Sequence, residues 1–547
     1  MKKIILFVLT FLAACLFATI IVSAQCTSVM VAKDASVDGS VMTTHTCDGW
    51  YDQRVRIIPG QKFEPGAEAE VMKVDVYKEL CHITRPGVEP IKAGEIPQVP
   101  ETYTYFHIGY PFMNEKQVII GEATWSGERA LRNSQGIFMI EELEAFGLQR
   151  AATARECIQI MGELAEKYGY GDGGEGLTVT DPNEVWLFEI AGPGPLWSPG
   201  SDRPGAVWAA QRVPDGHVSV IANRSRIGEI DLDDPDHFMA SENVMSLAEE
   251  LDLWNPDDGP FSFWKAYNPE PYGSRYYQQR REWRALSLLA PSLNLDPYQE
   301  EQYPFSVKKK KKVSVRDLMA IKRDHYEGTE FDLTAGMAAG PFGNPNRYPT
   351  PGDVKPEDKK NLDWERAISI FRCSYSFVSQ ARSWLPDPIG GVLWFGEDAP
   401  HSTCYVPIYA GATSVPESFS SGRRDVYDKD AAWWAFNFVS NWADLKYSYM
   451  IQDIQAAQQK VEGDFFAMQP AVELAGVQLY EQDPELAVKY ITNYTHNCAN
   501  RAVKRWWELA DELVAKYDDG YVGDLDSVGY PTWWLEEVGF GDGYLKE

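Results

Sequence analysis

The sequence predicts an α+β protein in which antiparallel β-sheets and helices form separate layers. Short β-prone runs follow one another from residue 26 to about residue 222, with Asp/Gly/Pro turns such as 34–39 and 214–216 between them. Turns of this kind join antiparallel strands. From Lys429 onward the pattern is helical. Strands and helices segregated in this way favour α+β layers over a doubly wound parallel sheet.

Most of the predicted strands lie in the amino-terminal half of the chain. The β-prone runs 26–32 and 40–44 flank the Asp/Gly turn and suggest a hairpin. The further strands expected, in chain order, are 54–58, 117–122, 136–140, 177–180, 185–190, 206–212, 217–222, 373–381, 391–395 and 403–409.

Helices are predicted in three regions. Residues 152–167 carry apolar side chains at helical spacing, and Gly169 follows their end. The middle, about 235–361, is rich in Trp, Tyr, Pro and Asp and combines loops with short helices. The last part, about 429–547, is helical, and its Trp pairs are expected in the core. The helices expected in these last two regions are 238–251, 280–290, 315–323, 431–443, 445–461 and 484–517.

The length of 547 residues permits about two to four domains, or one large body with insertions. We predict a single catalytic domain over residues 26–547. Residues 235–361 are then an insertion, and residues 429–547 are the helical part of the same domain.

Residues 1–25 have the pattern of a cleaved secretory leader. A short basic segment precedes an almost uninterrupted apolar run over 4–22, and residues 22–24 are the small residues that signal peptidase prefers. The run is also long enough to stay as a membrane anchor, and residues 12–15 resemble a lipobox. The predicted location is secreted, periplasmic or at the cell envelope, with membrane contact only if the leader is retained.

Composition excludes some partners. A net charge of −29 argues against nucleic acid, which needs clustered Lys and Arg, and the basic run 308–312 is expected to be a solvated loop or strand end. After the leader no run is long and apolar enough to span a membrane. Eight cysteines are too few for a disulfide scaffold. Loss of Cys15 with the leader leaves an odd number, so one thiol is expected to be free, and Cys26 is the candidate.

Cys26 could carry the chemistry if it were the mature amino terminus. Its thiol would be the nucleophile and its own α-amine, with an unperturbed pKa near 8, the general base, so no histidine is needed. The favoured cleavage bond, after Ala24, leaves Gln25 in front of Cys26. The mechanism therefore requires cleavage after Gln25 or removal of Gln25 by the enzyme itself.

Sequence blocks along nearly the whole chain resemble one family. They are Cys26 to Ser40, Met113 to Gly127, Thr180 to Trp186, Val213 to Gly216 with Ala222 to Ile227, Asp324 to Gly328 with Gly340 to Gly343, Ser379 to Arg382, and Tyr405 to Gly411. In this order they are similar to the C69-type dipeptidases, relatives of penicillin V acylase and bile salt hydrolase. The resemblance implies an N-terminal-nucleophile (Ntn) hydrolase fold, an αββα sandwich whose nucleophile begins a strand.

The resemblance also implies site residues. Cys26 matches the nucleophile, Asp48 the aspartate that orients the α-amine, and Asn223 the asparagine that donates to the oxyanion. Thr124 falls where the acylases place a second such asparagine, and Arg382 matches the arginine that tunes the thiol, although it could equally be a surface ion-pair residue.

His45 stands where the family has an arginine. It lacks the permanent charge and planar fork of arginine, which places the tuning of the thiol in question. A site residue and an ordinary strand residue are equal alternatives for His45.

The sequence leaves three functions to compare. We expect a secreted cysteine-type dipeptidase, a thiol protease that hydrolyses dipeptides and needs no cofactor or metal. The alternatives are an N-acyl amide hydrolase of the penicillin V acylase or bile salt hydrolase type, and a non-catalytic envelope protein that binds peptide or carbohydrate. The sequence contains no His-Glu-x-x-His, Gly-x-Ser-x-Gly or phosphate-binding Gly-Lys-Ser/Thr motif. It leaves a homo-oligomer open.

Overall fold

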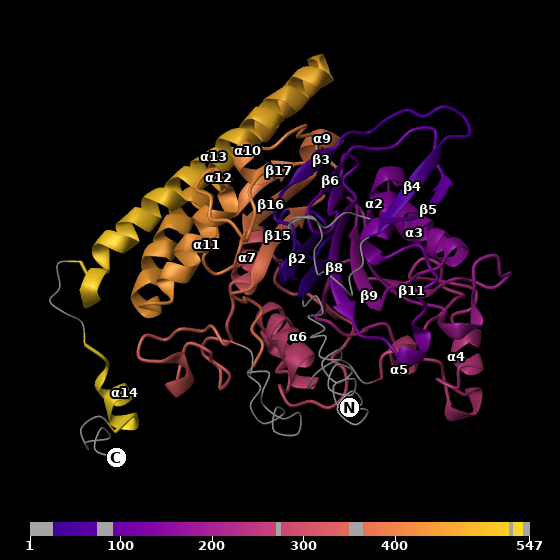
Figure 1. Ribbon diagram of the computed structural model, residues 1–547, viewed down its shortest axis with the longest axis horizontal. Helices are drawn as coiled ribbons and strands as arrows, with labels where there is room; N and C mark the ends of the chain where they lie inside the picture. Colours follow the sequence, from indigo (N-terminus) through magenta and orange to yellow (C-terminus); the bar gives the residue numbers. More distant parts are fainter. Residues whose placement is uncertain (1–25, 74–90, 270–274, 349–364, 524–528, 540–547) are drawn as a thin grey trace, which may run out of the picture.

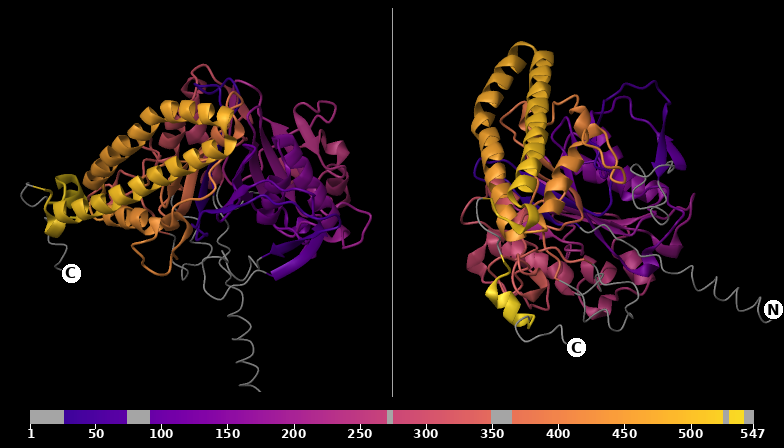
Figure 2. Two further views of the ribbon diagram at one scale, coloured as in Figure 1. Left: turned by 90° about the horizontal axis from the view of Figure 1, so that it is seen from above. Right: turned by 60° about the vertical axis from the view of Figure 1, so that its left-hand side comes forward.

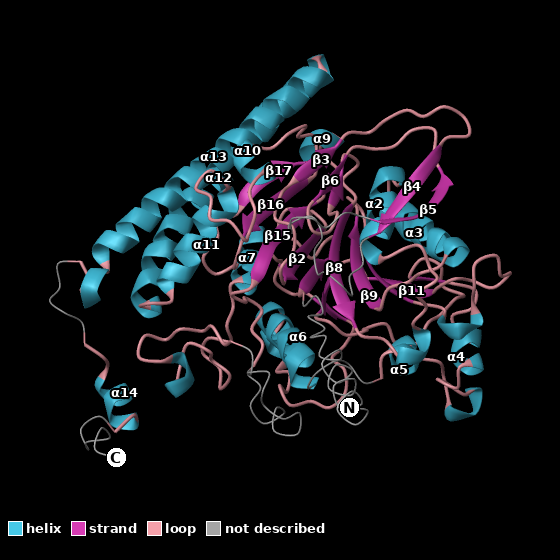
Figure 3. Ribbon diagram, in the orientation of Figure 1, coloured by secondary structure: helices cyan, strands magenta, loops and turns pink. Residues whose placement is uncertain are grey.

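Two large antiparallel sheets form the centre of the protein (Figures 1 and 3). The computed structural model describes residues 26–73, 91–269, 275–348, 365–523 and 529–539. The predicted leader, residues 1–25, lies outside these residues. Every ladder between strands in the described parts is antiparallel, which confirms the expected mixed α and β architecture with antiparallel sheets.

The first sheet contains the amino-terminal strand at its centre. Its order is β14-β12-β1-β2-β15-β16-β17. The strands span β14 Ser306–Lys308, β12 His217–Ile221, β1 Ser28–Val31, β2 Met42–Asp48, β15 Cys373–Gln380, β16 Val392–Glu397 and β17 Val406–Tyr409.

The second sheet has the order β13-β11-β10-β9-β8-β7-β6-β3. The strands span β13 Phe238–Ala240, β11 Val207–Arg212, β10 Val185–Ala191, β9 Gly174–Thr180, β8 Ile119–Trp125, β7 Met113–Asn114, β6 Tyr105–His107 and β3 Arg56–Ile58. A separate two-stranded sheet pairs β4 (Glu68–Lys73) with β5 (Ile91–Pro97).

Helices cover the outer face of each large sheet. The pair α2 (Ile140–Arg150) and α3 (Ala154–Tyr168) packs on the second sheet. On the first sheet lie α7 (Val315–Lys322), α11 (Ala432–Ala443), α12 (Tyr447–Gln482) and α13 (Pro484–Lys516), the last two forming the long antiparallel hairpin in Figure 2. The remaining helices are α4 Ser246–Glu250, α5 Phe263–Tyr267, α6 Arg275–Leu289, α9 Asp387–Gly390, α10 Glu417–Ser420 and α14 Thr532–Glu537.

The core lies between the two sheets, where β1 and β2 face β8 and β9. All residues of β2, β9 and β10 are buried, because one side of each strand meets the opposite sheet and the other meets helices or loops. Sheets covered on both faces carry near-continuous apolar runs rather than a strict alternation. A polar side chain in this layer therefore needs a partner inside the protein.

Several predicted elements differ from the structure. The strand expected at 136–140 is wrong: Phe138 makes only an isolated bridge to Tyr170, and α2 begins at Ile140. Its apolar residues instead lie in a loop and at the start of a helix. A short apolar run in the sequence does not distinguish these from a strand. The helix expected at 238–251 is instead the edge strand β13 followed by the short α4, since β11 offers a free edge to pair with.

The middle segment, residues 235–361, contributes strands to both large sheets. Its strand β13 is an edge of the second sheet, and its strand β14 is an edge of the first. Lys308 is the last residue of β14, so the basic run begins at a strand end. The expected helix 445–461 continues to Gln482 through Pro470.

Two further observations concern membrane contact and cysteines. Among the residues that the structure describes, no helix is both long enough and apolar enough to cross a membrane. The described cysteines are all unpaired and buried, Cys26 among them. Cys81 lies outside the described residues.

Candidate active site

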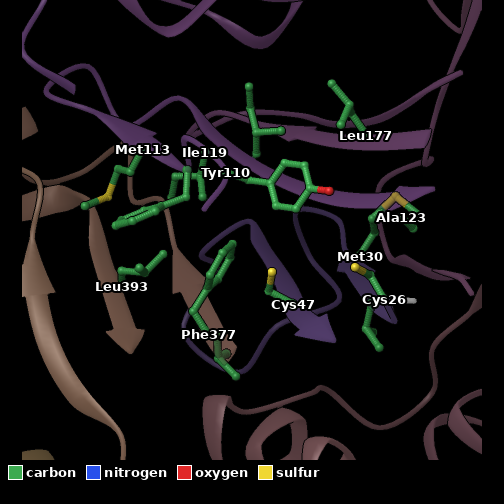
Figure 4. Close-up of a cluster of buried hydrophobic side chains, with 14 of the residues drawn as sticks. Cys26, Met30, Cys47, Tyr110, Met113, Ile119, Ala123, Leu177, Phe377 and Leu393 are labelled. Atoms are coloured by element: carbon green, nitrogen blue, oxygen red, sulfur yellow. The ribbon is translucent and has the colours of Figure 1, made fainter. Parts of the chain in front are cut away.

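The candidate site is built around Cys26, which lies two residues before β1, an inner strand of the first sheet, and is fully buried. The main-chain N–H of Thr27 donates to Oγ1 of Thr46 at 3.0 Å. A side chain of β2 thus holds the beginning of β1. The β1–β2 register sets Cys26 opposite Cys47, and Figure 4 shows both thiols among buried apolar side chains between the sheets.

The thiol of Cys26 contacts a carboxyl group of the opposite sheet. Its Sγ donates a hydrogen bond to Oε2 of Glu122, in β8, at 2.9 Å. Burial raises the pKa of the Cys26 thiol well above its usual value, and the charge of Glu122 raises it further. The resting nucleophile is therefore a neutral thiol, and it must lose its proton to a nearby base before it can attack.

Glu122 belongs to a pair of buried carboxyl groups. Its Oε1 accepts a hydrogen bond from Oγ1 of Thr124 at 2.6 Å, and its side chain shares a hydrogen bond with Glu175 on the neighbouring β9. Burial raises the pKa of Glu122, while the hydrogen bond from Glu175 lowers it. Burial and the charge of Glu122 raise the pKa of Glu175 well above its usual value. Glu175 thus keeps its proton, and Glu122 is the member of the pair that ionises.

His45 supports Glu122 through the main chain. Its Nδ1 lies 3.1 Å from the amide nitrogen and 3.0 Å from the carbonyl oxygen of Glu122, and its ring packs against Tyr375 and Phe377. Burial lowers the pKa of His45 to about 3, so the ring is neutral. Ligand atoms of Cys26, His45 and Glu122 lie within 4.8 Å of one another, and these three could hold a metal ion.

Two basic side chains, Arg281 and Lys322, donate hydrogen bonds to the main chain of Cys26 and Thr27. Nη1 of Arg281, in α6, donates to the carbonyl oxygen of Cys26 at 2.7 Å and to Oγ1 of Thr27 at 2.8 Å. Its Nη2 donates to Oδ1 of Asn223 at 3.0 Å. Nζ of Lys322, at the end of α7, donates to the carbonyl oxygen of Thr27. One guanidinium group therefore fixes both the nucleophile's main chain and the Asn223 amide.

The orientation of Asn223 is set from both ends of its side chain. With its Oδ1 held by Arg281, its Nδ2 donates to the carbonyl oxygen of Thr124 at 2.7 Å. Asn223 follows β12 with φ of 60°, a left-handed conformation that asparagine tolerates better than most residues. These two contacts fix the plane of the amide and the direction in which its nitrogen donates.

Asp48, the last residue of β2, is linked to the chain beside Cys26 through Thr46. Oγ1 of Thr46 accepts from the main-chain N–H of Thr27 and donates to Oδ2 of Asp48 at 3.2 Å, and the charge of Asp48 raises the pKa of the Cys26 thiol. Asp48 is fully buried and its Oδ2 is ion-paired with Arg366. Its Oδ1 has no hydrogen-bond partner within the described parts of the chain. The carboxylate is thus fixed by an arginine close to Cys26.

The structure does not bring Arg382 to this group. Its guanidinium pairs with Glu473 and donates to two carbonyl groups near α9. Cys47, the neighbour of Cys26 on β2, pairs with Tyr375 on β15. Arg382 lies seven residues after Tyr375, which in an extended chain is roughly 23 Å between the two residues. The assignment of Arg382 is corrected: Arg281 and Arg366 are the arginines near the nucleophile. The other predicted residues, Asp48, Asn223, Thr124 and His45, lie around Cys26.

Sequence reasoning missed five residues of this group. Glu122 carried a signal, because it is a charged residue inside an apolar strand. Lys322 and Arg281 lie in predicted helices, but no feature of the sequence marks them as site residues. Glu175 and Arg366 belong to no predicted strand, helix or motif. Their proximity to Cys26 depends on contacts between segments far apart in the sequence.

Stability should depend on pH through Lys322. Burial lowers its pKa from 10.5 to about 7. Between pH 7 and 10.5 the unfolded chain therefore binds a proton that the folded protein has released, so stability rises with pH; below pH 7 lysine is charged in both states and the cost of burying the charge is fully present. We expect a contribution of roughly 5 kcal/mol across this window.

Chemical denaturation of the wild type and of Lys322→Met at intervals from about pH 6 to 9.5 measures this contribution. The wild type should gain free energy of unfolding relative to the variant as the pH rises. Parallel curves for the two proteins would show that Lys322 does not change its protonation on folding.

Most of the chain is similar to one family of known proteins. The profile described as Peptidase family C69 matches residues 25–460. A probable dipeptidase of Latilactobacillus sakei is 29% identical over 421 residues, covering 75% of this chain and 79% of the relative. Dipeptidase A of Lactobacillus helveticus is 23% identical over 523 residues, covering 90% and 98%. A probable dipeptidase of Salmonella dublin is 25% identical over 401 residues, covering 71% and 81%.

Proposed function

Because the chain belongs to peptidase family C69, we propose that it is a dipeptidase of the Ntn-hydrolase type, with Cys26 as an amino-terminal nucleophile. The observation that carries this proposal is the position of Cys26 between two fixed partners. Its thiol contacts Glu122, and its carbonyl oxygen accepts a hydrogen bond from Arg281. Relatives named dipeptidases support a small peptide as substrate.

In the proposed reaction the α-amine of Cys26 takes the thiol proton. The Sγ–C bond forms at the substrate carbonyl, and the π electrons move to its oxygen. The tetrahedral intermediate then collapses, the C–N bond breaks, and the α-ammonium group returns the proton to the leaving amine. Water hydrolyses the resulting thioester, again with the α-amine as base. Asp48 orients the amine.

Asn223 is the proposed donor to the oxyanion. Its side-chain amide, held between Arg281 and Thr124, would donate from Nδ2 to the developing negative charge, a role typically worth about 3 kcal/mol in the transition state. Thr124 is near enough to help, although its hydroxyl already donates to Glu122. Arg281 acts as a positioning residue for this amide.

The mechanism requires removal of residues 1–25. We propose export through the leader, followed by cleavage or trimming that exposes the α-amine of Cys26 outside the cytoplasm. Cys26 is fully buried while residues precede it. Removing the chain at this point is also the simplest way to give a dipeptide access to the thiol.

The test is a substrate panel on protein whose mature amino terminus has been established by mass spectrometry. We expect unblocked dipeptides to be cleaved into two amino acids, and penicillin V and bile-acid conjugates to be poor substrates. Cleavage of the N-acyl amides alone would indicate the acylase alternative. No cleavage, together with no labelling of Cys26 by a thiol-directed probe, would indicate a binding protein.

A further inference from the structure

We propose that the carboxylate of Glu122, supported by Glu175, binds the free α-ammonium group of the substrate's first residue. This inference rests on the proposed dipeptidase function and specifies what that site recognises. It follows from a feature that the mechanism above does not use: a buried carboxyl group in direct contact with the nucleophilic sulfur.

The distances fit such a subsite. In any amino acid residue the α-nitrogen lies about 2.5 Å from its carbonyl carbon, two bonds away. A nucleophile poised for attack stands about 3 to 3.5 Å from that carbon. Oε2 of Glu122 is 2.9 Å from Sγ of Cys26. An ammonium group on the attacked residue therefore comes within reach of this oxygen, at the roughly 2.8 Å of a charge-assisted hydrogen bond.

The charge of the pair also fits. Burial raises the pKa of both carboxyl groups, and the charge of Glu122 raises that of Glu175 further, so a cation bound between them would stabilise the ionised form. The ion pairs near the pocket join Arg366 to Asp48 and Arg224 to Glu282. In the described parts of the chain, no lysine or arginine pairs with Glu122 or Glu175. A buried carboxylate is costly unless it is paired, and the substrate's ammonium group would supply the partner.

Further acceptor capacity lies in the same place. Oε2 of Glu175 is buried and has no hydrogen-bond partner among the described residues. An ammonium group has three hydrogens to donate, and between them Glu122 and Glu175 present enough oxygens to accept more than one. The enzyme's own α-amine has a different carboxylate available, because the charge of Asp48 also acts on Cys26.

This subsite would separate dipeptides from N-acyl amides. An acyl group in place of the amine brings no positive charge to Glu122 and leaves the carboxylate buried and unpaired. Sites built to bind a polar substrate group reject analogues that lack it far more strongly than apolar pockets reject a change in size. The same residue would therefore account for peptidase rather than acylase activity on a shared scaffold.

The experiment compares alanyl-alanine with propionyl-alanine, which differs only in lacking the α-amine. The wild type should prefer alanyl-alanine by about 100-fold in kcat/KM. Glu122→Gln should lose about 100-fold more on alanyl-alanine than on propionyl-alanine, so that the preference collapses. Any effect of the Glu122 charge on the thiol itself changes the rates of both substrates alike. Glu144→Gln is the matched control. Glu144 is equally buried, on α2, and burial raises its pKa well above the usual value, so it is already uncharged.

An equal loss on both substrates would overturn the proposal, because Glu122 would then act on the thiol or on the enzyme's own amine. If Glu122→Gln does not fold, the wild type alone decides. Alaninamide should slow alkylation of Cys26 by iodoacetamide far more than propionamide does, and equal protection would overturn the proposal. This binding test also separates the two hypotheses. If alaninamide protects Cys26 in a protein that cleaves neither substrate, the dipeptidase function fails and the ammonium subsite stands.

Discussion

Cys26→Ala is expected to abolish dipeptide hydrolysis, with a loss of roughly 10⁴-fold or more in kcat. The reason is that no other thiol can take its place: Cys47, although it lies opposite Cys26, belongs to β2 and has no α-amine that could become free. Alanine in place of the buried Cys26 removes one sulfur atom from a packed layer, so we expect a loss of only about 1 kcal/mol in the free energy of unfolding. Turnover of a dipeptide and thermal unfolding measure the two effects separately.

Two variants complete this test. Cys26→Ser keeps a hydroxyl nucleophile beside the same amine and should retain weak activity. Cys47→Ala is the matched control, because it removes an equally buried thiol of the same layer and should leave kcat nearly intact. Undiminished hydrolysis by Cys26→Ala would show that another group attacks the substrate, and the assignment of the site would fall.

A single residue left in front of Cys26 should be almost as damaging. In protein that begins at Gln25, the nitrogen of Cys26 is an amide, which is not basic and cannot take the thiol proton. Loss of a general base typically costs 10²- to 10⁴-fold, and we expect about 10³-fold here.

Two preparations that differ only at the amino terminus provide the measurement, each verified by intact mass. Trimming the inactive form with an aminopeptidase, so that it begins at Cys26, should restore the rate of the processed form. Full activity in protein that still carries Gln25 would contradict the role of the α-amine. A base among the side chains would then be needed, and Glu122 is the one in contact with the thiol.

The sequence predicted most strands near the site because local patterns decide them. The hairpin of β1 and β2, and the strands β8, β9, β10 and β15, follow from β-prone runs separated by turn residues. The exceptions are segments whose structure depends on a distant partner. Residues 238–240 form a strand only because β11 presents an edge, and the strands β4 and β5 stabilise each other across an intervening segment.

For the site, the sequence by itself predicted the nucleophile and the positions that the family resemblance marks: Cys26, Asp48, Asn223, Thr124 and His45. The tertiary structure alone decided their chemical surroundings. It set Glu122 against the thiol, placed Arg281 and Lys322 behind the main chain of Cys26, and removed Arg382 from the group. The physical reason is that side chains meet here across two sheets and two helices. Their proximity depends on strand register and layer packing, and a one-dimensional pattern carries no record of either.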